Sequence, residues 1–419
     1  MGSHLKAFGS RVLPVTLVAG GALFAVPGVA SAAFAGPNGA IVFQSTESGI
    51  TPCSPFTSSE LFSVPPSGGA VSQVDCNGHT DQHAFVSPDG TEIVFASNRS
   101  GGSGAFQLYT GSLTSPGGVV SVSYPPNAGV DDYPSWAPAA PGAQATIIFQ
   151  RTLPGGIPQL YTENVNTPSS PASPVFSTPS GFSDTEPVFD PSNKNEIAFV
   201  RQASGGPQQI YTYDLSTPAT PPVNLSSSDG DGATNDSKPD FAPTQTGSPA
   251  TQEIVFQSDR PTTTASGGPC AGTQIYTTTD QAGSAVTPVF QVIAGSPPAP
   301  TGQQICPTVS GTNVATENPV FSPQGNAIAY DQPGPNSQDV FTFDVSLSNG
   351  VGMMNTVKDL TPNFATDESP NWAPVFPGAS TPEVPQSIVL PAAGAGVFGA
   401  AGFLTLWKRR RTQSVALVS

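Results

Sequence analysis

The chain has 419 residues, and only 10% of them are charged, yet its formal net charge at pH 7 is -16. Between positions 33 and 379 there are 7 basic and 28 acidic residues, a net charge of -21. A body this acidic repels phosphate backbones, so nucleic acid is not an expected partner. The 44 glycines and 47 prolines, placed between short apolar runs, favour strands joined by turns over a helical enzyme.

The N-terminus, residues 1–32, predicts a secretory signal peptide. The basic residues Lys6 and Arg11 precede an apolar run, residues 12–26, and the small residues 30–32 (ASA) follow it. A basic start, an apolar segment and a small-residue cleavage site are the three parts of such a signal. A transmembrane anchor is the alternative, although the apolar run is short for a span. We therefore expect an exported protein, extracellular or at the cell surface.

Three sequence patterns recur in a fixed order between residues 39 and 376. Pattern A is Asp-x-x-Pro-x-aromatic-x-Pro, pattern B is a β-branched run that ends in an aromatic residue, and pattern C is an aliphatic residue followed by an aromatic one. Each occurs six times, and B and C have the composition of strands. Copies of A begin at Asp81, Asp131, Asp184, Asp236, Thr316 and Asp367; copies of B end at Phe43, Phe95, Phe149, Phe199, Phe256 and Tyr330; copies of C begin at Leu61, Leu108, Leu160, Ile210, Ile275 and Val340.

The spacing of these patterns predicts an all-β fold, a six-bladed β-propeller of four-stranded blades with a less regular strand D after each C. The closing prolines of pattern A lie 50 to 53 residues apart, except for one interval of 80. A period near fifty with about four strands is typical of propellers. The chain opens with B and C and ends with A. We therefore expect the last A, residues 367–374, to pair with the first B and close the ring without a free sheet edge.

Residues 85–90 (FVSPDG) and 321–325 (FSPQG) resemble the TolB-like propeller repeat, a WD40-like repeat centred on F-S-P-D-G. The resemblance covers roughly residues 39–376, and it implies the fold while leaving the function open. The same repeat forms a gating domain in prolyl-oligopeptidase-type peptidases, which also need a hydrolase domain with a G-x-S-x-G elbow. The nearest string here, residues 101–105 (GGSGA), departs from that elbow at its last position.

Four cysteines predict two disulfide bonds in an exported protein. Cys53 and Cys270 each lie between a B and a C pattern, while Cys76 and Cys306 each follow the next strand D. Because B and D run the same way in an antiparallel blade, each pair falls on one rim, which favours the links Cys53–Cys76 and Cys270–Cys306. Free thiols or a metal site are the alternatives, but no C-x-x-C spacing supports a metal. The second pair lies in the longest interval and indicates an inserted rim loop.

The aspartates that open pattern A are the candidate metal ligands. Their repetition predicts a ring of carboxylates near one mouth of the central channel, which could hold a cation such as Ca²⁺. The alternative is structural, with each carboxylate accepting backbone N–H bonds at the turn into its strand. The candidates are Asp81, Asp131, Asp184, Asp236 and Asp367. No other cofactor is expected.

A second candidate site is the group His79, Asp81 and His83, which follows Cys76 in the sequence. Histidine and carboxylate are both metal ligands and acid–base catalysts. The only other histidine is His4, so this group cannot be completed to a three-histidine zinc site.

Two other features have plain structural interpretations. Residues 229–240 begin like a calcium loop, but Ala233 lacks the expected oxygen ligand and the last position is Asp240 instead of Glu, which favours a polar surface loop. Trp136 and Trp372 occupy the aromatic position of pattern A, where we expect them to pack in the core.

The C-terminus predicts a linker over residues 377–387 and an anchoring segment over residues 388–411. About twenty apolar residues precede four basic ones, and such a stretch can cross a bilayer with the basic cluster on the cytoplasmic side. The layout resembles bacterial sorting signals. Residues 390–394 (LPAAG) resemble the sortase motif LPxTG, but Ala393 replaces its threonine. A plain membrane anchor or another sorting system fits as well.

Two functions remain open on these grounds. One is a non-catalytic binding or scaffold propeller, monomeric and displayed at the cell surface, which binds a protein or a glycan through a face of loops on a rigid ring. The other is an extracellular glycan lyase or hydrolase at the channel mouth, which needs a general acid and base in one pocket. His79, Asp81 and His83 are its candidate catalytic group.

Overall fold

The computed structural model describes residues 35–47, 58–100, 105–113, 118–123, 129–139, 145–167, 170–227, 234–243, 252–260, 270, 272–289, 307–309, 312–346, 351–352, 356–363 and 365–375. These residues form strands, turns and loops, and no α-helix occurs among them. The chain divides into two units, residues 1–376 and 377–419. The predicted signal peptide, linker and C-terminal anchor lie outside the described residues. Within the described ranges, no helix has the length and apolar character needed to span a bilayer.

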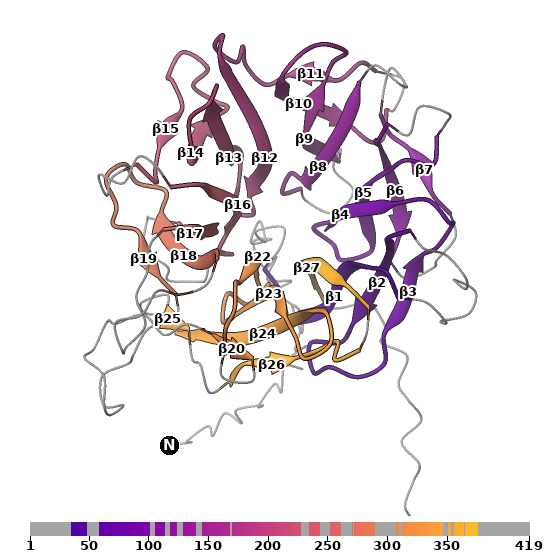
Figure 1. Ribbon diagram of the computed structural model, residues 1–419. Coiled ribbons are helices and arrows are strands. Elements are labelled where there is room, and N and C mark those ends of the chain that lie inside the picture. The colour runs from indigo at the N-terminus through magenta and orange to yellow at the C-terminus, as the bar shows by residue number, and fades with distance from the viewer. Residues whose placement is uncertain are drawn as a thin grey trace, which may run out of the picture. The chain divides into compact units, whose positions relative to one another are not determined.

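Six antiparallel sheets surround a central axis as the blades of a propeller (Figure 1). Blade 1 is β27 (Asp367–Pro374), β1 (Asn38–Ser45), β2 (Glu60–Val64) and β3 (Ser72–Asp75); blade 2 is β4 (Asp81–Val86), β5 (Glu92–Ser97), β6 (Gln107–Ser112) and β7 (Val120–Ser121). Blade 3 is β8 (Val130–Trp136), β9 (Thr146–Thr152), β10 (Pro158–Asn164) and β11 (Ser173–Pro174); blade 4 is β12 (Phe182–Asp190), β13 (Asn193–Ala203), β14 (Gln208–Asp214) and β15 (Val223–Asn224).

Blades 5 and 6 complete the ring. Blade 5 is β16 (Asp236–Phe241), β17 (Glu253–Ser258), β18 (Gln274–Thr279) and β19 (Thr287–Pro288). Blade 6 is β22 (Glu317–Phe321), β23 (Ala327–Pro333) and β24 (Gln338–Ser346), with two short strands paired to β24, namely β25 (Val351–Gly352) and β26 (Lys358–Asp359). Between the two blades β20 (Thr308–Val309) pairs with β21 (Thr312–Asn313). Patterns A, B and C thus form the first, second and third strands of each blade, which confirms the predicted propeller.

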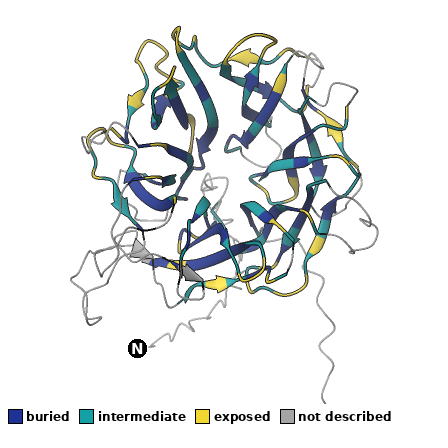
Figure 2. Cartoon of the chain, in the orientation of Figure 1, coloured by how far each residue is buried: buried dark blue, intermediate teal, exposed yellow. Residues whose placement is uncertain are grey.

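Each hydrophobic core lies between two neighbouring blades. The six clusters of buried side chains each combine residues from adjacent sheets, and one of them joins blade 6 to blade 1. The aromatic residue that ends pattern B is fully buried in every blade: Phe43, Phe95, Phe149, Phe199, Phe256 and Tyr330. Figure 2 shows the buried residues along the strands and the exposed ones on the outer turns. Because a blade buries its apolar faces only against its neighbours, the fold needs a closed ring.

The ring closes as the order of the patterns predicts. β27 pairs antiparallel with β1, with Trp372 opposite Ile41 and Asp367 opposite Ser45. The Trp372 indole Nε1 donates a hydrogen bond of 3.0 Å to the Gly39 carbonyl. Trp372 is 7% exposed and packs in the cluster between blades 6 and 1, and Trp136 is 1% exposed. Both tryptophans are therefore core residues, as expected.

Candidate functional site

The third residue of pattern A has the same unusual backbone conformation in all six blades. Its φ angle lies between 49° and 56°, in the left-handed region that side chains other than glycine seldom adopt. The pairing between the first and second strands shifts register beside this residue in every blade, so each first strand carries a bulge. We call these six residues the channel ring: His83, Tyr133, Glu186, Lys238, Asn318 and Ser369.

Side chains of the preceding blade hold this conformation. In four blades the backbone N–H of the ring residue donates to a side-chain oxygen on the second strand of the blade before it. The pairs are His83 to Gln44 at 3.3 Å, Glu186 to Gln150 at 3.2 Å, Asn318 to Gln257 at 2.8 Å and Ser369 to Asp331 at 3.1 Å. The Lys238 N–H donates to Glu186 at 2.7 Å. The strained conformation is thus fixed by contacts between blades at five of the six positions, while the Tyr133 N–H donates to Asp132 of its own strand. Such strain gathers at functional sites.

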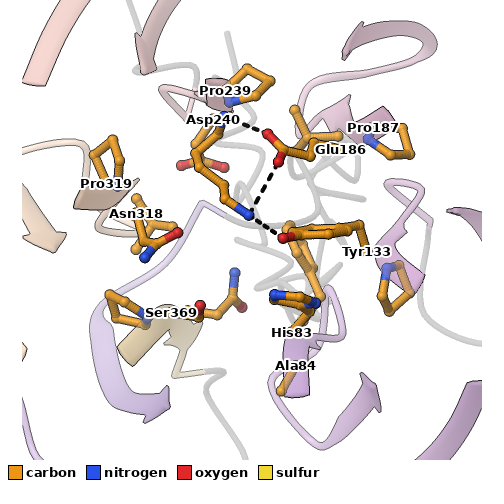
Figure 3. A pocket seen from close by; sticks show the side chains of 17 residues that line it. His83, Ala84, Tyr133, Glu186, Pro187, Pro239, Asp240, Asn318, Pro319 and Ser369 are labelled. Carbon is orange, nitrogen blue, oxygen red and sulfur yellow. Dashed lines mark hydrogen bonds and ion pairs between the residues drawn. The ribbon is translucent and has the colours of Figure 1, made fainter. Parts of the chain in front are cut away.

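The channel ring surrounds a cavity on the propeller axis (Figure 3). Its volume is about 100 Å³, several times the ~10–15 Å³ that one water molecule requires. All six ring side chains line it and are partly exposed. The proline that follows the ring residue in five blades also lines it. A small polar group or the end of a side chain therefore fits the cavity.

Four of the six channel-ring side chains are charged or aromatic, and they contact one another. The His83 Nδ1 lies 2.7 Å from a carboxylate oxygen of Asp132, and the His83 ring stacks on Tyr133 with centroids 3.7 Å apart. Lys238 bonds the Tyr133 hydroxyl and lies 3.2 Å from a carboxylate oxygen of Glu186. Burial raises the pKa of Tyr133 to about 12. Burial alone would lower the pKa of Lys238, but the adjacent Glu186 carboxylate raises it above its ordinary value, so Lys238 is charged at neutral pH.

The fifth residues of pattern A follow the ring residues by two positions, and four of them line both the ring cavity and a second cavity. We call these six the waist residues: Phe85, Ser135, Val188, Asp240, Val320 and Asn371. In alternate blades the waist side chain accepts the backbone N–H of the next blade's aromatic position. The Asn371 amide oxygen accepts from Val86 at 2.8 Å, the Ser135 hydroxyl from Phe189 at 3.2 Å, and the Asp240 carboxylate from Phe321 at 2.8 Å. The same structural bond is thus made by three different side chains.

Asp240 is the exceptional waist residue because its side chain can ionise. Burial raises its pKa to about 7, and backbone N–H bonds from Phe321 and Phe241 only partly offset that cost. No charged side chain contributes to the shift among the described residues. Asp240 lines both the ring cavity and a second cavity of about 40 Å³, whose other walls are aromatic residues and prolines together with Val320, Ser322 and Asn371.

We expect Asp240→Asn to stabilise the protein at pH 8 and to change little at pH 4. The pKa of about 7 in the folded chain lies above the ordinary 3.8, so the folded state binds an extra proton between these values and loses stability as pH rises through them. Asparagine removes this cost and keeps the bond to Phe321, as Asn371 does in blade 1. Thermal melts of both chains at pH 4 and pH 8 should differ by several degrees at pH 8 only. Equal melting at both values would contradict the prediction.

The predicted aspartates lie in a different environment from the channel ring. Asp81, Asp131, Asp184 and Asp236 are each 0% exposed, and none of them lines either cavity. Each forms an ion pair with an arginine from its own blade, with N···O distances of 2.6–2.9 Å: Arg99, Arg151, Arg201 and Arg260. The four arginines lie over the aromatic side chains that end pattern B and belong to pattern C. These contacts supply a structural role, while cation binding stays a prediction.

Asp367 in blade 1 differs from the other four. It is 0% exposed, and no ion pair is formed by it among the described residues. Burial raises its pKa to about 6, with Ser45 and Thr361 as hydrogen-bond partners that offset part of the cost. Within the described part of the chain, no group of three or more His, Cys, Asp and Glu side chains has a geometry that could hold a metal ion.

The proposed group of His79, Asp81 and His83 does not share one environment. His79 is exposed, Asp81 is buried against Arg99, and His83 lines the central cavity. Of the three, only His83 belongs to the candidate site. One feature of the sequence could have indicated the other channel-ring residues. The third position of pattern A differs in all six copies, although the proline that follows it is repeated in five of them.

Cys76 and Cys270 are not free thiols. Cys53 and Cys306 lie outside the described residues, so the pairing stays a prediction. Residues 229–233 of the segment over residues 229–240 also lie outside them, while residues 236–240 belong to β16 and the last, Asp240, is a waist residue.

Comparisons with known proteins found similar folds among solved structures, and they leave the function of this chain open. No protein-family model matches the chain, and neither does any curated protein. Among solved structures, hydrazine synthase of Kuenenia stuttgartiensis aligns with a TM-score of 0.54 and 11% identity over 81% of this chain. This chain spans 47% of the length of that one.

Two further solved structures align with lower TM-scores. TolB from Acinetobacter baumannii aligns with a TM-score of 0.49 and 16% identity, over 80% of this chain and 67% of its own. The structure of a nidogen/laminin complex aligns with a TM-score of 0.48 and 10% identity, over 80% of this chain and 98% of its own. TolB propellers are thus among the structural neighbours, and identities this low show a common fold alone.

Proposed function

We propose that this protein is a binding propeller whose ligand, a protein or a glycan, enters the central channel and contacts the channel ring. One observation carries the proposal. The residues that build each blade repeat, whereas the ring position holds six different side chains on one strained backbone conformation. Because the fold does not require these six side chains, their chemistry is available for recognition.

The exposure of the ring side chains and the hydrogen bonds that fix their backbone support a ligand-binding role for the channel in preference to a purely structural one. The ring side chains are partly exposed to a cavity, and hydrogen bonds between blades fix the backbone that carries them. Preorganised groups lose little conformational entropy on binding.

We include export and tethering by residues 388–411 in the proposal, on the basis of the two terminal sequence patterns. Separation of membrane and soluble fractions, with the full chain and a chain that ends at Ala379, would test the tether.

The test is a comparison of two double variants on arrays of proteins and glycans. His83→Asn with Lys238→Asn removes two ring side chains, and asparagine suits the left-handed backbone because Asn318 already occupies that position in blade 6. His79→Asn with Lys194→Asn makes the same exchanges at exposed positions. We expect the control to bind the same partners as the natural chain and the ring variant to lose at least about tenfold in affinity. Unchanged binding by the ring variant would show that the ligand binds elsewhere.

A glycan-active enzyme at the channel mouth is the second candidate, and the His83–Asp132 pair favours it. Asp132 holds the Nδ1 of His83 at 2.7 Å, which leaves Nε2 as the nitrogen available for proton transfer. Shortened glycan products that form with the natural chain and not with the ring variant would support this function over simple binding.

A further inference from the structure

The proposed function does not specify the chemistry of the ligand. The charges along the channel indicate which kind of ligand group would bind there. Four side chains that line the two cavities carry or can carry a charge: His83, Glu186, Lys238 and Asp240. Lys238 pairs with Glu186, and His83 pairs with Asp132. Once these pairs are formed, the Asp240 carboxylate is the charge on the described channel wall that no other side chain balances.

The fold does not need that charge. Asn371 and Ser135 make the corresponding bond to the next blade with neutral oxygens. A carboxylate at this position makes the same bond, but when it is ionised its partly buried charge has no charged partner among the described residues. A costly charge that contributes nothing specific to folding is typical of a functional site.

We infer that Asp240 binds the positively charged end of an extended side chain, an ammonium or guanidinium group, that a protein partner inserts through the channel ring. This inference rests on the proposed function. Phe85 lines both cavities together with Asp240 and packs against the clusters on both sides of the channel, so an aromatic ring lies at the same waist. A cation gains from both an ion pair and an aromatic face.

The volume of the cavity and the net charge of the chain are both compatible with a cationic side chain as the ligand. A cavity of about 100 Å³ has room for roughly seven to ten water-sized groups, which is enough for the charged end of one extended side chain. The body of the chain carries a net charge of -21 between positions 33 and 379, and such a field attracts cations toward an acidic channel.

Calorimetric titration of the purified full-length chain tests the inference. The probe is Nα-acetyl-lysine amide, and Nα-acetyl-norleucine amide lacks only the ammonium group. We expect the lysine compound to bind about 10- to 100-fold more tightly than the norleucine compound, and Asp240→Asn to remove that difference. Asp214→Asn makes the same exchange at the exposed end of β14 and should leave the difference in affinity intact.

Three results would overturn the inference. They are equal binding of the two compounds, undiminished lysine binding by Asp240→Asn, and tighter binding of glucosamine, which would indicate a glycan instead. The melts at pH 8 show whether Asp240→Asn is folded. If the ring variant loses its partner on the arrays while Asp240→Asn keeps it, this inference fails and the proposed function stands.

Discussion

A chain that lacks residues 367–374 is expected to lose the cooperative unfolding transition of the propeller. The deletion removes β27, which leaves β1 paired with β2 alone, with one edge free, and takes Trp372 out of the core between blades 6 and 1. Replacing a buried tryptophan by alanine alone costs about 3–5 kcal/mol, a large part of the roughly 5–15 kcal/mol that stabilises a typical domain. Thermal and urea unfolding, followed by circular dichroism, measure the effect.

The control for this deletion is a chain that ends at Ala379, which keeps every described residue. It should unfold as the full chain does. Two single variants make the same exchange at the same position of the repeat. Trp372→Ala changes the core at the ring closure, and Trp136→Ala changes the core between blades 2 and 3. A deletion that melts at the same temperature as the control chain would refute closure as the source of stability.

Arg151→Met is expected to destabilise the protein by about 3–5 kcal/mol, because it leaves Asp131 buried without its counter-ion. The two side chains are 3% and 1% exposed, and two hydrogen bonds of 2.6 and 2.7 Å join them. The guanidinium also lies 5.1 and 5.3 Å from the ring centroids of Phe149 and Tyr161. Urea unfolding gives the free energy of the change.

The double exchange Arg151→Met with Asp131→Leu should cost less than Arg151→Met alone, because no unpaired charge stays buried. Lys194→Met is the surface control, with an expected change within about 0.5 kcal/mol. A double variant that is less stable than the single one would contradict this account. The same melts with Ca²⁺ or a chelator address the predicted cation ring, since a bound ion raises the melting temperature of the natural chain.

The sequence by itself was enough to predict the blades, their number and the closure. Each repeat contains its own pattern of β-branched, aromatic and turn residues. The second strand at Ile41 has no first strand before it in the sequence, and the first strand at Asp367 has no second strand after it, so the two are expected to pair with each other, as they do. The buried tryptophans follow from the same register, because a position that is core in one blade is core in the others.

Two features could not be predicted from the repeated patterns. The four arginines that neutralise the aspartates lie 17 to 24 residues after them, with no constant offset, so the sequence indicated a ring of carboxylates but not its partners. The left-handed conformation of the channel ring is held by side chains of the neighbouring blade. Sequence patterns report what is alike among repeats, whereas the candidate site consists of residues that differ among them and meet only when the ring is assembled.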